Sequence, residues 1–182
     1  LHLLKGAGET KIDDKHTLNV LSVFDEDNWV ATTEPDKINI ALYHGAISGV
    51  ETDAGYVLEH GEHPIDVFEG HDFAFLGDIH KTNQILDTEG RVRYCGSTVQ
   101  QNHGETNDKG FLLWDIKSIK DFSVEFYPIK HYNPFVTVNW QGSTPATISV
   151  CMKNWPAGAR YRIRSTTDLD PKTKRKLATV LR

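Results

Sequence analysis

Short apolar runs, each closed by turn-forming residues, recur along the first two thirds of the chain. The run INIALYH, residues 38–44, lies between an acidic turn and a glycine, and its length is typical of a strand. Six other runs have the same character, and we expect strands over residues 18–24, 28–33, 72–77, 91–97, 110–116 and 121–129. In this part of the chain only residues 63–70, HPIDVFEG, predict helical turns. The pattern therefore predicts a β-rich α/β body with few helices.

The pattern changes after this body. Arginines alternate with apolar and aromatic residues along residues 159–166, ARYRIRST, and this alternation predicts another strand. A helix is expected to start at Asp170, because aspartate is a good N-cap and Pro171 suits the first helical position. Three residues would form the apolar face of this helix: Leu177, Val180 and Leu181. We therefore expect two domains, residues 1–130 and residues 131–182, the second being a small α/β segment.

The net charge changes sign between these two parts of the chain. Residues 1–130 contain 11 Lys or Arg and 23 Asp or Glu, a net charge of −12, whereas residues 131–182 contain 9 and 2, a net charge of +7. An acidic body suits the binding of cations, and a basic appendage suits a polyanion. The alternative is that the basic residues only form a solvated face.

Composition narrows the class of protein further. No run of about 18 apolar residues is present, so we expect no membrane span. The first ten residues hold a lysine and glycines where a signal peptide has its apolar core, so none is expected. Cys95 and Cys151 are too few for a disulfide framework, which favours a reducing, cytoplasmic setting.

The candidate chemistry lies where two apolar runs end. Residues 38–44 end in His44, and residues 73–77 are followed at once by Asp78 and His80. In open α/β sheets, ligands bind at the carboxyl ends of the strands. Residues two apart in an extended segment project to the same side, so we expect Asp78 and His80 to reach one site with His44.

Imidazole nitrogens and carboxylate oxygens together suit Mn, Zn or Fe. In a hydrolytic two-metal centre, one ion activates a water molecule and both ions stabilise an in-line displacement at phosphorus. The alternative for each residue is structural. An aspartate can cap a turn and a histidine can bond to a neighbouring strand, and the remaining histidines are expected to be surface residues, except that His103 could approach the crevice.

Three segments in order, LYHG, FAFLGDIHK and RVRYCGSTVQQNHGETNDKGFLLWDI, resemble the second half of the calcineurin-like metallophosphoesterases. The similarity is greater to the Mre11/SbcD-type DNA-repair nucleases and covers roughly residues 38–130. Eight residues match the last motif of that family in order: Tyr94, Gly96, Ser97, Thr98, Glu105, Lys109, Gly110 and Phe111. The segment after 131 is similar to the start of the family's capping domain.

The resemblance implies a partial metallophosphoesterase-type β-sandwich flanked by helices, and a manganese-dependent DNA exo- and endonuclease of double-strand-break repair or recombination. It implies two manganese ions, with magnesium possible, held here by His44, Asp78 and His80. Further residues are expected to bind substrate: Gly96, Ser97, His103, Arg160, Arg162, Arg164, Lys172 and Lys174. Arg175 and Lys176 extend this basic set. The implied partners are DNA, a Rad50/SbcC-like ATPase and a second copy of the nuclease.

Two departures from the family pattern are visible. Asp78 stands where the family has the first histidine of its GHxH motif, which puts the metal preference in doubt. The earlier family motifs, D-x-H, GD-x-x-D and GNH[DE], do not precede His44. Taking GDIH as the first motif instead would require the others downstream, and no GNH occurs. We therefore expect these residues to be the later part of a longer enzyme and to be inactive alone. The alternatives are a phosphatase or small-molecule phosphodiesterase of the same fold, and a metal-free DNA-binding scaffold.

Overall fold

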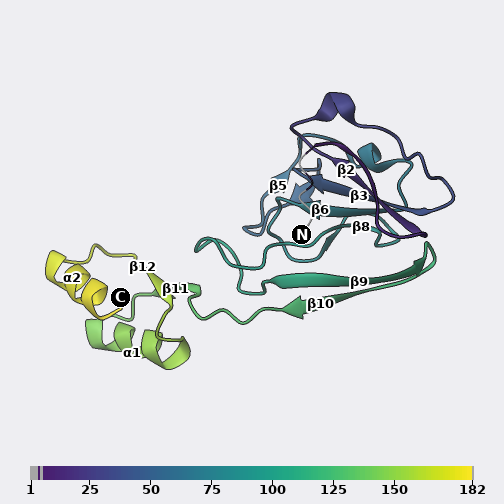
Figure 1. The fold of residues 1–182 in the computed structure, drawn as a ribbon. Helices are drawn as coiled ribbons and strands as arrows, with labels where there is room; N and C mark the ends of the chain where they lie inside the picture. The colour runs from purple at the N-terminus through teal and green to yellow at the C-terminus, as the bar shows by residue number, and fades with distance from the viewer. Residues whose placement is uncertain (1–3, 5, 182) are drawn as a thin grey trace. The chain divides into compact units, whose positions relative to one another are not determined.

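The computed structural model describes residue 4 and residues 6–181, and shows a mixed α/β chain with several small sheets and few helices (Figure 1). The chain divides into two compact units, which are described separately. The first unit comprises residues 1–98 and 108–128, and the second comprises residues 99–107 and 129–182. The expected boundary after residue 130 lies two residues beyond the last residue of the first unit. The second unit also takes up a loop, residues 99–107, that the sequence pattern did not assign to it.

A six-stranded sheet forms the centre of the first unit. Its strands, in their order across the sheet, are β1 (Gly8–Lys11), β2 (His16–Leu21), β3 (Ile38–His44), β6 (Phe73–Gly77), β8 (Val92–Tyr94) and β7 (Gln84–Ile85). The four inner strands are parallel, and the two edge strands pair antiparallel with their neighbours. The carboxyl ends of β2, β3, β6 and β8 therefore meet at one edge of the sheet.

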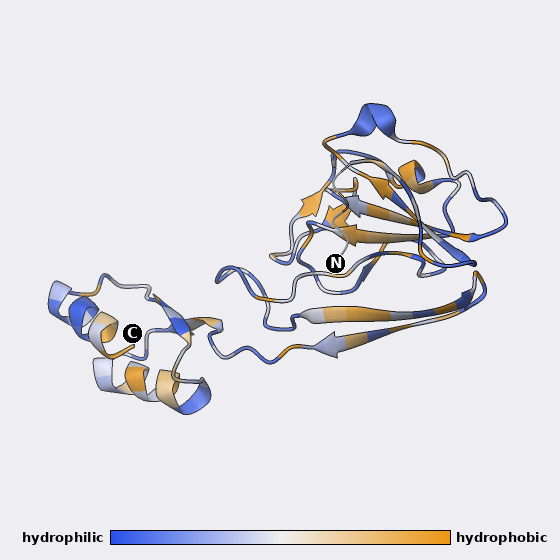
Figure 2. Cartoon of the chain, viewed as in Figure 1, coloured by the Kyte–Doolittle hydropathy of each residue, from blue (hydrophilic) through white to orange (hydrophobic). Residues whose placement is uncertain are grey.

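One face of this sheet carries the main core. Ala41, Ala74 and Tyr94 are fully buried, and Tyr43 and Leu76 are almost so. The connections that cover this face contain the short hairpin of β4 (Val50–Glu51) and β5 (Val57–Leu58), and the 3₁₀ turns η1 (Glu26–Asn28) and η2 (Ile65–Phe68). Figure 2 shows the central strands as hydrophobic and η1 as hydrophilic. The core is built from alternate residues of parallel strands, as the pleat requires.

The opposite face of the sheet is covered by a long hairpin of β9 (Gly110–Ser118) and β10 (Asp121–Pro128). Trp114 and Phe122 on the hairpin meet Phe73 and Phe75 on β6, with ring centroids 4.5–6.0 Å apart. These distances fall in the range of favourable aromatic pairs. Both hairpin strands alternate between half-buried and exposed residues, so one side of the hairpin faces the sheet and the other faces outwards.

The second unit follows a simple β–α–β–α order. β11 (Phe135–Asn139) pairs in parallel with β12 (Arg160–Arg164), and α1 (Thr144–Asn154) connects them. α2 (Pro171–Val180) begins as the sequence predicts, because the Asp170 carboxylate accepts hydrogen bonds from the backbone N–H of Lys172 and of Thr173. The core of the unit consists of four buried residues: Val136, Val138, Cys151 and Ala159. Partly buried side chains pack around them: Val150, Tyr161, Ile163 and Leu181.

Most predicted strands are present, but one prediction is wrong. Residues 28–33 form no strand. They belong to the connection between β2 and β3, which run parallel and so need a crossover rather than a hairpin turn. The place beside β2 that such a strand would occupy is taken by β1. The hydroxyl groups of Thr32 and Thr33 instead donate hydrogen bonds to Glu9 on β1.

The Tyr94 side chain fixes the loop after β3 from inside the core. Its hydroxyl donates to the Gly45 carbonyl at 2.6 Å and accepts from the Ile47 N–H at 3.0 Å. Burial raises the pKa of Tyr94 to about 12. The tyrosine of β8 thus holds the chain directly after His44, although the two strands are separated by β6.

We predict that Tyr94→Phe lowers the free energy of unfolding by about 1–3 kcal/mol, because two buried backbone groups lose their hydrogen-bond partner. Tyr127→Phe is the matched control, since its hydroxyl donates to Glu125 on the exposed side of the hairpin. Urea denaturation of both variants measures the difference. Equal stabilities of the two would contradict the role given to Tyr94.

Candidate metal site

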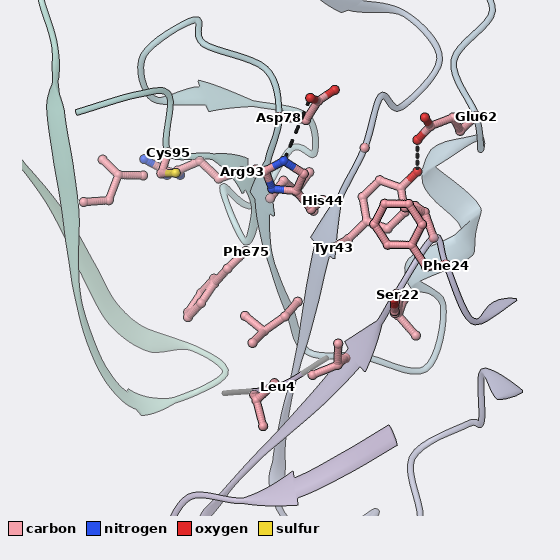
Figure 3. Close-up of a pocket in the computed structure, with 18 of the residues that line it drawn as sticks. Leu4, Ser22, Phe24, Tyr43, His44, Glu62, Phe75, Asp78, Arg93 and Cys95 are labelled. Carbon is pink, nitrogen blue, oxygen red and sulfur yellow. Dashed lines mark hydrogen bonds and ion pairs between the residues drawn. The ribbon is translucent and has the colours of Figure 1, made fainter. Parts of the chain in front are cut away.

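The carboxyl edge of the sheet opens into a cavity of about 850 Å³ in the first unit (Figure 3). Leu42, Phe75 and Trp114 give it an apolar wall, while His44 and Asp78 supply polar groups from the ends of β3 and β6. A concave, mostly apolar pocket with a few convergent polar groups is the usual form of a ligand site. The ends of these two strands thus border one cavity, and His80 is not among the residues that line it.

His44 and Asp78 face each other at this edge (Figure 3). The His44 Nε2 and Asp78 Oδ1 atoms are 3.9 Å apart, and the two side chains are 79% and 50% exposed. Gly77 stands beside His44 in the register of β3 and β6. A Cβ atom at Gly77 would lie 2.6 Å from His44 Nδ1, so only glycine leaves room for the imidazole in this position.

The backbone turns sharply at Asp78, which has a φ of 86°. This left-handed region favours glycine, and among other residues asparagine, aspartate and histidine are the most tolerated. The turn directs the chain away from β6 immediately after the carboxylate. It also removes the extended geometry on which the expected pairing of Asp78 with His80 depended.

The described structure does not bring His80 into a cluster with the pair. Among residue 4 and residues 6–181, no three His, Cys, Asp or Glu side chains are grouped closely enough to hold a metal ion. Ile79, between Asp78 and His80, is buried, and His80 itself is half-buried. Because Asp78 is not extended, the two side chains need not project to the same side.

The pair satisfies part of the requirement for a divalent ion. Two ligand atoms that each lie about 2.1 Å from one ion are at most about 4.2 Å apart, and the His44–Asp78 distance is within that limit. One nitrogen and one carboxylate oxygen are donor types that manganese and zinc accept. The described residues thus supply two ligands of a site, and a complete coordination shell needs further donors.

A buried ion pair that the sequence pattern did not predict anchors the segment that follows Asp78. Lys109 is fully buried, and its ammonium group donates to Asp53 Oδ2 and to the His80 carbonyl oxygen, both at 2.9 Å. The Asp53 side chain is only 6% exposed. The match of Lys109 to the KGF part of the family motif was the only signal in the sequence that pointed to this residue.

The Glu62 carboxylate also holds the loop after β3 in place, through two hydrogen bonds. Glu62 accepts hydrogen bonds from the Tyr43 hydroxyl at 2.9 Å and from the Ala46 N–H at 3.1 Å. Burial and this carboxylate raise the pKa of Tyr43 far above its usual value. Glu62 lines the same cavity as His44 (Figure 3). The loop is thereby held by Glu62 from the cavity side and by Tyr94 from the core.

Gly96 and Ser97, which were expected to bind substrate, follow β8 directly after Cys95. Gly96 has a φ of 84°, and a Cβ atom there would lie 2.8 Å from the Thr82 backbone. The Ser97 carbonyl accepts a hydrogen bond from the Gly110 N–H. Their neighbour Cys95 lines the cavity, whereas these two residues are not part of its wall.

The remaining expected substrate-binding residues belong to the second unit. His103 lies against Phe135, with ring centroids 4.9 Å apart, and its Nε2 is 3.1 Å from the Arg160 carbonyl oxygen. Arg162 donates to the His103 carbonyl and to Thr137 Oγ1. The others are exposed, on β12 or on α2: Arg160, Arg164, Lys172 and Lys174. Lys174 pairs with Asp168 at 2.8 Å.

Comparison with known proteins leaves the activity open. No protein-family model matches the chain. Uncharacterized protein R555 of Acanthamoeba polyphaga mimivirus is 32% identical over 130 residues, which cover 65% of this chain and 9% of the viral protein. The chain thus spans less than a tenth of that relative's length. The resemblance to calcineurin-like phosphoesterases stays a prediction. In the part of the chain that the structure describes, no helix is long and apolar enough to cross a bilayer.

We predict that Lys109→Met lowers the free energy of unfolding by about 3–5 kcal/mol, because it leaves the buried Asp53 carboxylate without the lysine charge. Lys11→Met removes an exposed ion pair with Asp14 and should cost less than about 1 kcal/mol. Denaturant unfolding of the two variants tests this difference. In the double variant Lys109→Met with Asp53→Leu, most of the lost stability should return, and a purely additive loss would contradict the pairing.

Proposed function

We propose that the first unit contributes a divalent-metal site to a phosphodiesterase, and that the whole protein is a manganese-dependent DNA nuclease of the metallophosphoesterase fold. The observation that supports this most directly is the His44–Asp78 pair, at 3.9 Å, on the adjacent ends of two parallel strands. The ordered match to the family motifs over residues 38–130 supports the choice of substrate. The proposal assigns His44 and Asp78 as ligands and keeps His80 as a prediction from sequence.

The residues around the pair have a defined part in this proposal. A bound ion of this kind polarises a phosphodiester and lowers the pKa of a coordinated water. His44 and Asp78 would hold the ion at the mouth of the cavity. Glu62, Tyr94 and Lys109 would fix the two loops that carry these ligands, so that little reorganisation is needed on binding. The other ligands would come from residues beyond those described.

A phosphatase or small-molecule phosphodiesterase uses the same metal chemistry. The net charge of the second unit favours a polyanionic substrate over a small one. This unit contains ten Lys or Arg and three Asp or Glu, a net charge of +7. The ATPase partner and the homodimer implied by the family resemblance stay predictions.

We predict that the 182-residue chain binds Mn²⁺ and that His44→Ala or Asp78→Ala weakens binding at least about ten-fold, because each removes a ligand. Loss of the free Mn²⁺ signal in electron paramagnetic resonance measures the affinity. Asp78→Gly distinguishes loss of the carboxylate from strain in the turn, because glycine tolerates the backbone conformation and lacks the ligand. His60→Ala, an exposed histidine on another loop, is the control. Unchanged affinity in the His44 and Asp78 variants would contradict the site.

The activity is tested on the complete gene product with Mn²⁺. Cleavage of single- and double-stranded DNA supports the nuclease, whereas hydrolysis of bis-p-nitrophenyl phosphate without DNA cleavage would favour a small-molecule phosphodiesterase. DNA binding without metal binding and without hydrolysis of either substrate would favour the metal-free scaffold.

A further inference from the structure

The first unit is strongly acidic, with 10 Lys or Arg and 22 Asp or Glu and a net charge of −12. Most of the cations that the structure describes in this unit are satisfied locally. Arg93 donates hydrogen bonds to the Gly90 carbonyl and to Asn83 Oδ1. Five others form ion pairs: Lys11 with Asp14, Lys37 with Glu34, Lys81 with Glu51, Arg91 with Glu89 and Lys109 with Asp53.

The remaining described cations of the unit are Lys15, Lys117 and Lys120, and none of them pairs with a carboxylate. All three line one hollow of about 530 Å³. Lys15 belongs to the turn between β1 and β2, whereas Lys117 and Lys120 lie on either side of the turn between β9 and β10. Within an acidic unit, the unpaired positive charge of the described residues is thus concentrated around a single hollow.

The hollow lies at the opposite end of the sheet from the candidate metal site. Ile38, the first residue of β3, lines the hollow, and His44 is the last residue of the same strand. A strand of this length spans about 20 Å between these two residues. The lining of the hollow has no residue in common with the cavity at His44 and Asp78.

Hydrogen bonds fix the turns that carry the lysines. Asp13 Oδ1 accepts from the Lys15 N–H at 2.7 Å, and the Lys15 carbonyl accepts from the Ile38 N–H at 2.8 Å. In the other turn, Ser118 Oγ accepts from the Lys120 N–H at 3.3 Å. A ligand would therefore meet backbone that is already ordered, which lowers the entropic cost of binding.

The rest of the lining sets the charge and polarity of the hollow. Asp14 is paired with Lys11 and Lys37 with Glu34, so Asp36 is the one lining carboxylate that no described cation neutralises. Three free ammonium groups and one free carboxylate leave a local charge of about +2. Three apolar residues form another part of the lining: Pro35, Ile38 and Ile119.

We propose that this hollow binds a small anion with several phosphate groups, such as the triphosphate of a nucleotide. Its volume falls in the range of small-molecule sites, about 300–1,000 Å³. Lysine ammonium groups bind phosphate as point charges. The phosphates would contact Lys15, Lys117 and Lys120, and a sugar or base would lie against Ile119, whose side chain is 41% exposed. Turns border the hollow, which suits a compact ligand better than an extended acidic peptide.

The test is isothermal titration calorimetry of the 182-residue chain with inorganic tripolyphosphate, in EDTA. Lys117→Gln with Lys120→Gln should weaken binding about ten-fold or more, since an exposed charge contact is worth up to about five-fold in affinity. Lys172→Gln with Lys176→Gln removes the same charge from α2 of the other unit and should change the affinity by less than about two-fold. Equal losses in the two double variants would overturn the proposal.

Asp36→Asn tests the charge of the hollow in the opposite direction. Removing its free carboxylate should tighten tripolyphosphate binding about two- to five-fold, because a repulsion between like charges is lost. A variant that only disturbed the turn would weaken binding instead. Far-ultraviolet circular dichroism verifies that each variant is folded. Unchanged or weaker binding by folded Asp36→Asn would contradict the site.

A comparison of ligands identifies the source of the phosphates. Tighter binding of ATP than of tripolyphosphate supports a nucleotide, whereas equal or weaker binding of ATP supports an inorganic phosphate chain. Tighter binding of (dT)15 or of a polyglutamate peptide, with the same dependence on Lys117 and Lys120, would overturn the proposal in favour of a macromolecular partner. Failure of both ATP and tripolyphosphate to bind at millimolar concentration would overturn it as well.

This inference does not rest on the proposed nuclease function. Asp78→Asn should bind tripolyphosphate like the parent chain, because Asp78 does not line the hollow and EDTA removes divalent ions from the measurement. Absence of a metal site would leave the affinity for tripolyphosphate unchanged, and loss of this anion site would leave the binding of Mn²⁺ unchanged.

Discussion

The ammonium group of Lys109 is fully buried, and three segments of the first unit meet around it. It joins the Asp53 carboxylate after β4 and the His80 carbonyl after β6 to the start of β9. Removing a lysine and an aspartate from water is costly, and only a close, well-bonded arrangement offsets that cost. The loops at the carboxyl edge of the sheet therefore have one arrangement in which this charge is satisfied, and the geometry around Asp78 depends on it.

The candidate site depends on glycine as much as on its ligands. Gly77 leaves room for the His44 imidazole, and Gly96 lets the turn after β8 approach the Thr82 backbone. Neither glycine has a chemical role. Both permit close approaches that a Cβ atom would block, and the one at Gly77 leaves the His44 imidazole room to lie 3.9 Å from the Asp78 carboxylate. This explains why short glycine-containing strand ends, rather than histidines in polar loops, were the informative signal in the sequence.

Sequence reasoning succeeded where local pattern and tertiary environment agree. Residues 38–44 form β3 as predicted, because a central parallel strand is buried on both faces. Residues 28–33 look like a strand but serve as a crossover, which depends on strand order rather than on local pattern. α1 was not predicted, because only Thr147 and Cys151 of this helix are buried and neither gives a strong apolar period. Lys109 and Asp53 were missed as a pair because 56 residues separate them.

The backbone at position 78 also restricts which residues can stand there. A φ of 86° is tolerated best by glycine, and then by asparagine, aspartate and histidine. Of these, only aspartate and histidine are common metal ligands. An exchange between aspartate and histidine therefore keeps a residue that tolerates the positive φ and can bind a metal ion. Most other side chains lack one of these two properties. In the proposed site, the carboxylate would add a negative charge beside His44, which would favour harder cations such as manganese or magnesium over zinc.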